Sequence, residues 1–153
     1  MSSKFAVAAI ALWLLTAAAA AVFFVRGDTT PASDGRVAIL LAPVERDFVL
    51  AEMRSMLVSL QQITQALARE DRAGVIKAAR AAGSRDGKEM SFGLMASLPL
   101  DFKQAGMAMH SAFGDLANSA ERSESVRALN AQLARNIDAC VECHRIYRID
   151  PAR

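Results

Sequence analysis

The chain has 153 residues, which is enough for one domain with its own core and a short appendage. Its 18 lysines and arginines are dispersed among 16 aspartates and glutamates, so the sequence lacks the basic footprint of a nucleic-acid-binding protein. Eight glycines and four prolines argue against a turn-rich all-β fold, and a hydrophobic fraction of 53% beside 22% charged residues indicates a strongly apolar segment joined to an ordinary globular part.

The apolar segment stands at the N-terminus, where Phe5 to Val25 form a run of 21 residues without a charge. At about 1.5 Å per residue, a helix of this length crosses the roughly 30 Å hydrocarbon core of a bilayer. A cleaved signal peptide is the alternative, because Lys4 precedes the run and Ala17 to Ala21 offer small residues to a peptidase. The apolar run continues beyond these alanines and exceeds the usual signal core of about 7–15 residues. Residues 1–25 are therefore interpreted as an uncleaved membrane anchor, and the remainder as exported.

Residues 26–43 are expected to link this anchor to the domain. From Arg26 to Ala38 the chain is mostly polar or small, contains two glycines and a proline, and shows no periodic apolar pattern. Such a composition predicts a short flexible tether.

Residues 44–153 contain four segments in which apolar residues recur at steps of three and four, the pattern of one apolar helix face. The four faces are Val49, Met53, Met56, Leu60, Ile63 and Leu67; Val75, Ile76, Ala79 and Ala82; Phe102, Ala105, Met109, Phe113 and Leu116; and Val126, Leu129, Leu133, Ile137, Cys140 and His144. Gly83 is the predicted stop of the second helix, and Asp101 and Ser123 are the predicted caps of the third and fourth. The stretch from Ser84 to Pro99 is expected to be a long connection. Four amphipathic segments without a convincing strand predict an all-α fold, an antiparallel four-helix bundle.

The chemistry is concentrated in Cys140-Val141-Glu142-Cys143-His144, the C-x-x-C-H pattern of covalent c-type haem attachment. On a helix, positions i and i+3 share a face, so two thiols can each form a thioether to a haem vinyl group while the adjacent imidazole reaches the iron. The motif therefore predicts one covalent haem c with iron, held by Cys140, Cys143 and His144.

Three other readings of the motif are weaker. A thioredoxin-like dithiol is expected beside a βαβ unit and at a helix N-terminus, whereas this pair lies late in a helix of an all-α chain. A zinc site needs further ligands, and the chain has no other cysteine. A disulfide between Cys140 and Cys143 leaves His144 unexplained. Because haem is attached to such motifs outside the cytoplasm, the domain is expected to face the periplasm from a bacterial inner membrane.

A haem motif at the end of the last of four helices resembles the class II cytochromes c, the cytochrome c-prime family. The resemblance covers about residues 44–150 and continues in Arg145-Ile146-Tyr147-Arg148, because the family typically follows its histidine with a tyrosine and an arginine at these offsets. It implies a periplasmic monohaem protein with redox partner proteins and, in many members, a homodimer. The N-terminal anchor departs from the family, whose members are mostly soluble.

The resemblance also implies a position for the sixth iron ligand. In the family the first helix faces the open side of the haem, where some members place a methionine and transfer electrons. Met53 matches best, because Arg54 follows it and Ile63 stands ten positions on, and Met56 is the reserve. The alternative is that both are core methionines, since methionine fills irregular gaps well. In that case the haem is five-coordinate and binds nitric oxide or carbon monoxide.

Other side chains receive weaker assignments. Met90, Met95, Met107 and Met109 are expected in the core or in loops, and His110 is expected to be hydrogen-bonded or partly exposed rather than an iron ligand. Arg148, four residues after His144, is expected one helical turn further on, where it can shield the imidazole or meet a haem propionate. It could equally be a solvated arginine at a helix end. Tyr147 is expected to pack its ring against the porphyrin edge.

The predicted function is electron transfer by a membrane-tethered cytochrome with His144 and Met53 as iron ligands. Gas binding is the second hypothesis, and a haem domain docked onto a larger redox complex is the third. No catalytic residues are predicted, because no carboxylate pair or nucleophile–base constellation occurs at a recognisable spacing.

Overall fold

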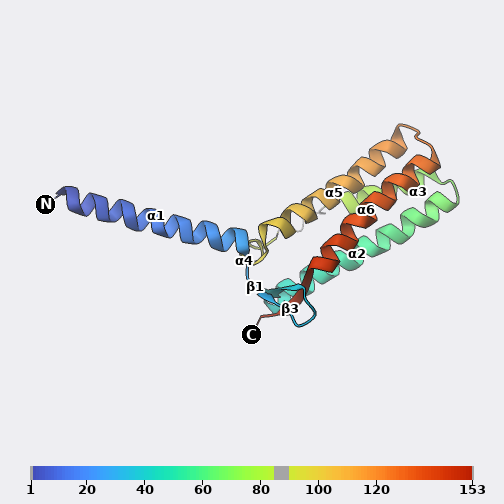
Figure 1. The fold of residues 1–153 in the computed structure, drawn as a ribbon. Coiled ribbons are helices and arrows are strands. Elements are labelled where there is room, and N and C mark those ends of the chain that lie inside the picture. The colour runs from blue at the N-terminus through green and yellow to red at the C-terminus, as the bar shows by residue number, and fades with distance from the viewer. Residues whose placement is uncertain (1, 85–89, 153) are drawn as a thin grey trace.

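The computed structural model describes residues 2–84 and 90–152, and within them the chain is mostly helical, as the sequence predicts. The helices are α1 (Ser2–Arg26), α2 (Pro43–Ala68), α3 (Arg72–Gly83), α4 (Phe92–Ser97), α5 (Leu100–Glu121) and α6 (Val126–Ile146). Three short strands, β1 (Thr29–Pro31), β2 (Val37–Leu41) and β3 (Tyr147–Pro151), complete it. Figure 1 shows α1 projecting away from α2, α3, α5 and α6, which lie side by side.

Helix α1 is the apolar N-terminal helix that the sequence predicts. From Lys4 to Arg26 it is long and apolar enough to cross a membrane, and none of this stretch is buried against the rest of the chain. Large side chains such as Leu12 and Trp13 are about two thirds exposed, at 67% and 69%. An apolar helix without a covering partner is unfavourable in water, and by length and composition α1 could cross a membrane.

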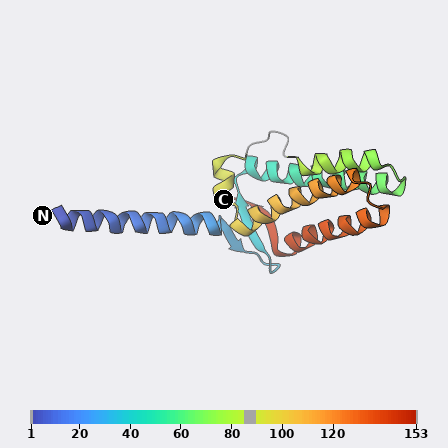
Figure 2. The same ribbon diagram turned by 90° about the horizontal axis from the view of Figure 1, so that it is seen from above.

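The main core lies between α2, α3, α5 and α6, the four segments whose apolar periodicity the sequence shows. It is formed by Ile63, Ala66, Leu67, Val75, Ala78, Ala79, Ala82, Phe113, Leu116, Ala117, Ala120, Leu129 and Leu133. Alanines on α3 and α5 allow close approach of the two helices, and Phe113 fills the largest volume. This core occupies the end of the domain that is distant from α1 (Figure 2).

The linker expected over residues 26–43 is instead part of a three-stranded sheet in the order β1-β2-β3. β1 pairs antiparallel with β2, and β2 pairs parallel with β3, from Val37 opposite Tyr147 to Leu41 opposite Pro151. Ile39 and Leu41 are fully buried, at 0% exposure, so β2 belongs to the core. The expectation of a strandless, flexible tether was therefore wrong, because the partner that orders β2 comes from the other end of the chain.

The sheet forms a second, smaller core with α2, α4 and α5. Its buried residues are Ile39, Leu41, Val49, Leu94 and Leu98, with Phe48, Met53, Met90, Phe102, Tyr147 and Ile149 packed against them. We call this the sheet-side cluster. The domain thus has one core at each end, and the C-x-x-C-H segment enters the sheet directly, because β3 begins at the residue after α6 ends.

Two predicted helix caps are displaced by a few residues. α5 begins at Leu100, so Asp101 lies in the first helical turn, where its charge still favours the helix dipole, rather than at the cap. Ser125 caps α6, its hydroxyl accepting from the backbone nitrogen of Ala128, whereas Ser123 occupies a left-handed turn position at φ 63°.

Ala105, expected on the apolar face of α5, is exposed. α3 ends at Gly83 as predicted, and α4 forms a short helix in the connection that follows, within which residues 85–89 lie outside the described part.

Candidate functional site

The last two turns of α6 carry the three residues of the motif. Cys140 and Cys143 are half-buried and share one helix face, whereas the His144 side chain is exposed. The helix ends two residues later, where the backbone nitrogen of Tyr147 donates to the Cys143 carbonyl. Arg145 pairs with Glu142 at 2.7 Å on the exposed side of the same turn. The site therefore stands at the end of a helix, with its thiols inward and its imidazole outward.

Both thiols are free, and their surroundings favour the protonated form. Burial raises the pKa of Cys140, and burial together with the neighbouring Cys140 raises the pKa of Cys143. A dithiol oxidoreductase needs the opposite, a depressed pKa that supplies thiolate at neutral pH. The raised pKa values of the two thiols run against the dithiol oxidoreductase alternative.

Met109 of α5 is the methionine that the structure places next to the motif. The Cys140 thiol lies 3.6 Å from the Met109 sulfur and 3.6 Å from the carbonyl oxygen of Asn136. One turn along, the Asn136 amide donates to the Ala112 carbonyl at 3.1 Å and joins the same two helices. Met109 is partly buried against the main core, in line with its expected place in the core or a loop, and its contact with Cys140 was not predicted. Counting outward from the turn between α5 and α6 would have placed Met109 opposite Cys140.

Met53 and Met56 lie on α2 and are both half-buried. Met53 packs against the sheet-side cluster, which also includes Tyr147, three residues after His144. Met53 of α2 therefore lies in the same sheet-side cluster as Tyr147, the first residue after the helix that carries the motif. Met56 stands one turn further along α2 and is not part of that cluster.

The position expected for Arg148, one helical turn beyond His144, is corrected by the end of α6 at Ile146. Tyr147 and Arg148 both belong to β3, so Arg148 is not one helical turn beyond His144. It pairs with Asp150 at 2.9 Å and with Asp34 at 3.2 Å. The Tyr147 ring packs edge-on against Phe102, with ring centroids 5.5 Å apart. The extended conformation follows from pairing with β2, which helix periodicity does not reveal.

An ionic cluster fastens the end of α6 to the turn between β1 and β2. Arg36 donates to the carbonyls of His144 and Tyr147, at 3.3 and 3.5 Å, and pairs with Asp34 at 2.7 Å. Hydrogen bonds from the Arg36 side chain and backbone hold the pKa of Asp34 at about 2. Hydrogen bonding to Asp150 raises the pKa of Arg148. Arg36 and Asp34 were not predicted, because nothing in their local sequence points to a helix end so far along the chain.

His110 is half-buried, and its Nδ1 donates to the Ala82 carbonyl at 2.8 Å. This confirms the expectation of a hydrogen-bonded histidine. This hydrogen bond joins α5 to α3, so His110 contributes to the packing of these two helices.

The donor set fits a haem better than a metal held by protein ligands alone. Within residues 2–84 and 90–152, no group of three or more His, Cys, Asp or Glu side chains is placed to hold a metal ion. A structural zinc site takes four protein ligands, whereas haem iron takes one or two and the cysteines bind the porphyrin periphery. The motif offers two free thiols on one helix face and an adjoining exposed imidazole, which is the set of groups that covalent haem binding requires.

Comparisons of the chain with models of protein families, with curated proteins and with solved structures found no match.

Proposed function

We propose that the chain is a membrane-tethered c-type cytochrome that transfers electrons through one covalently attached haem on the periplasmic side of a bacterial inner membrane. The observation that carries the proposal is the C-x-x-C-H segment at the end of α6, with two free half-buried thiols on one face and an exposed imidazole beside them. The apolar helix α1 supports the tether, since it is long enough to span a bilayer.

In this proposal Cys140 and Cys143 would hold the haem covalently and His144 would bind its iron. Each thiol would add across one vinyl double bond, the sulfur bonding to one carbon and the thiol hydrogen going to the other, so the attachment would consume no oxidant. When bound, the haem supplies a one-electron couple between ferric and ferrous iron. Arg36 restrains the backbone of His144 through its carbonyl, which limits movement of the imidazole.

We further propose that α2, α3, α5 and α6 are the four helices of a class II cytochrome bundle. Their shared core and the position of the motif at the end of the last helix support this assignment. The sheet pairs a strand that precedes α2 with a strand that follows α6, and it would be an addition to that architecture.

Met53 is the proposed sixth ligand, with Met56 as the reserve. Its support is its place in the sheet-side cluster, together with Tyr147. A thioether ligand favours ferrous iron, and two strong axial ligands keep the geometry of the iron nearly constant, which suits electron transfer. The same packing also fits an apolar wall. A five-coordinate haem that binds nitric oxide or carbon monoxide is therefore the second candidate.

The proposed partners are redox proteins, with a homodimer as a further possibility that α2 leaves open through its exposed Leu57 and Val58. Neither nucleic acid nor an enzymatic substrate forms part of the proposal.

The decisive experiment expresses the full chain in a bacterial host that attaches haem to exported proteins. We expect haem that stays on the polypeptide in denaturing gels. Replacing both cysteines, Cys140→Ser with Cys143→Ser, should abolish it. The matched control Ser55→Ala changes an exposed residue of α2 and should leave haem retention unchanged. Absence of covalent haem from the natural chain would refute the proposal.

The optical spectrum then separates the two functions. A low-spin ferric spectrum with a weak sulfur-to-iron charge-transfer band, lost in Met53→Leu and kept in Met56→Leu, would assign Met53 as the ligand. A high-spin spectrum with rapid carbon monoxide binding after reduction would instead establish the gas-binding protein.

A further inference from the structure

The junction between α1 and the domain is tightly packed. Gly27 ends the helix at φ 66°, its nitrogen donating to the Phe23 carbonyl at 2.8 Å. A Cβ added at Gly27 would lie 2.6 Å from the Pro99 nitrogen and from the Ser97 carbonyl oxygen, so the backbones of the two segments are in direct contact. The next residue, Asp28, donates its backbone nitrogen to the same Ser97 carbonyl at 2.8 Å. A freely swinging tether would have none of these contacts.

Lys103 of α5 fastens the end of α1 from the other side. Its side chain is 7% exposed, and its ammonium group donates to the carbonyls of Phe24 and Met95, at 2.9 and 3.0 Å. The same nitrogen stands 3.6 Å from the centre of the Phe24 ring. Burial lowers the pKa of Lys103. A buried cation is costly unless it is well partnered, and here the partners belong to α1 and to the segment before α5.

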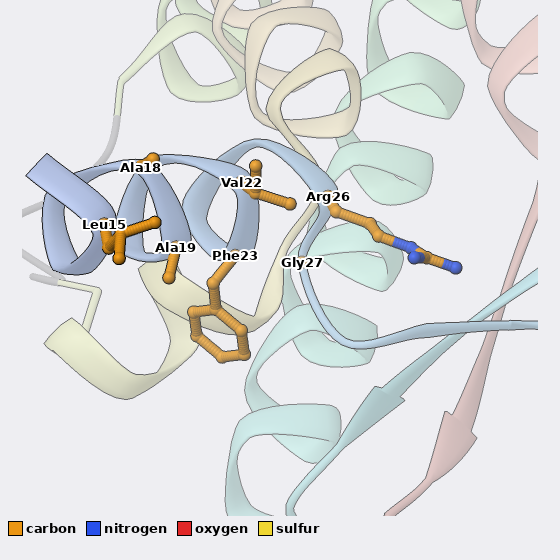
Figure 3. Close-up of a pocket in the computed structure, with 7 residues that line it drawn as sticks. All are labelled: Leu15, Ala18, Ala19, Val22, Phe23, Arg26 and Gly27. Carbon is orange, nitrogen blue, oxygen red and sulfur yellow. The ribbon is translucent and has the colours of Figure 1, made fainter.

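The length of α1 locates the bilayer surface. From Lys4 to Arg26 there are 23 residues, which at about 1.5 Å each span roughly the hydrocarbon core and put Arg26 at the headgroups. Figure 3 shows the apolar groove lined by Leu15, Val22 and Phe23 and, at its end, the Arg26 side chain extended away from them. An arginine at the end of an apolar span commonly reaches to the interface. β1 begins only three residues later, close to the headgroups.

The sheet and the C-terminus lie at the end of the domain next to α1, and both ribbon views agree on this (Figures 1 and 2). The turns that join α2 to α3 and α5 to α6 lie at the opposite end. Because α6 runs toward the sheet and Arg36 of the sheet turn bonds the His144 carbonyl, the motif belongs to the end near α1.

From this arrangement we infer that α1 and the domain form one rigid unit that docks the sheet end, and with it the Cys140–His144 segment, toward the lipid headgroup surface. The inference rests on the membrane anchoring proposed above and names the bilayer as the surface that the segment faces. An electron partner must then approach along the membrane plane, because the far end of the domain points away from it.

Energy transfer to labelled lipids tests this geometry in the full chain. The chain is placed in phospholipid nanodiscs with acceptor dyes on the headgroups, and a donor dye is attached at Ala152→Cys beside the sheet or at Ala68→Cys at the far end of α2. Both positions are exposed, and α2 alone adds about 40 Å between its ends. Cys140→Ser and Cys143→Ser in the labelled chain leave one reactive thiol. The measurement is repeated with the haem-loaded chain, in which both natural thiols are consumed.

We expect strong transfer from residue 152 and weak transfer from residue 68. Lys103→Met should raise transfer from residue 68 and broaden the donor lifetimes as the junction loosens, while Lys77→Met, at an exposed lysine of α3, should change neither. Equal transfer from the two positions in the natural chain would overturn the inference, and so would a Lys103→Met chain indistinguishable from it.

The failure of other proposals would look different. A chain that does not incorporate into nanodiscs refutes the anchor. A chain that keeps both Cys140 and Cys143 but carries no haem refutes the cytochrome, and the expected transfer from the labelled chain would then leave the docking geometry in place.

Discussion

Replacing Gly27 with alanine should weaken the junction between α1 and the domain by a predictable amount. The left-handed conformation costs a residue with a Cβ roughly 1–2 kcal/mol. The new methyl group also lies 2.6 Å from backbone atoms of Pro99 and Ser97, so the segments must separate. The bond from Asp28 to the Ser97 carbonyl should be lost at a cost of about 1 kcal/mol. The total is roughly 2–3 kcal/mol.

Gly35→Ala is the matched control, because Gly35 also has a positive φ, 84°, but no atom lies within 4 Å of an added Cβ. Only the conformational cost of roughly 1–2 kcal/mol is expected there. Both variants are compared with the natural chain by denaturant titration in the same detergent, followed by circular dichroism. If Gly27→Ala and Gly35→Ala lose equal stability, the close backbone contact at the junction does not exist as described.

Three further substitutions probe the domain. Asp34→Asn should remove a pH-dependent contribution to the stability of the folded chain, because the folded pKa of Asp34, about 2, lies below its ordinary value of about 3.9. This stabilisation is complete above about pH 4 and is lost as the pH falls toward 2. The melting temperatures of the variant and the natural chain should therefore converge over this range. Phe113→Ala, at a side chain 2% exposed, should cost about 3–5 kcal/mol in a denaturant titration, and a loss below about 1 kcal/mol would contradict the main core. Gly106→Ala, in α5 with no atom near the added Cβ, should stabilise by about 0.5–1 kcal/mol, seen as a raised denaturation midpoint, whereas a destabilised variant would contradict the open space described there.

The helices could be predicted because their information is local. The spacing of apolar residues alone predicts the buried face of α2, and three of the predicted residues, Val49, Ile63 and Leu67, are buried in the structure. Cap positions were less secure, because Ser123 and Ser125 both precede the same helix and only the backbone path decides that Ser125 caps it.

The sheet could not be predicted, because its pairing is remote. β2 is a run of five apolar residues, Val37 to Leu41, which periodicity cannot distinguish from the start of a helix. β3, Tyr147 to Pro151, follows an amphipathic helix without a glycine to mark its end. The sequence of each strand alone therefore does not identify it as a strand, because the pairing between β2 and β3 is what reveals both.

The candidate site divides in the same way. Cys140, Cys143 and His144 form a contiguous motif, so their proximity needs no tertiary information. Arg36 approaches the His144 carbonyl from the opposite end of the chain, and Lys103 looks like an ordinary solvated lysine until α1 is packed against it. The sequence alone predicts the residues of the motif, and the fold shows the groups that contact them.

The parallel pairing of β2 with β3 also sets the order in which the molecule can assemble. β2 precedes α2 and β3 follows α6, so their ladder closes a loop that contains all the intervening helices. Contacts so distant in the chain form late, since the entropy of closing the loop must first be overcome. β2 is synthesised long before β3, so the last turn of α6, which carries Cys143 and His144, is joined to the sheet only after the intervening helices have been made.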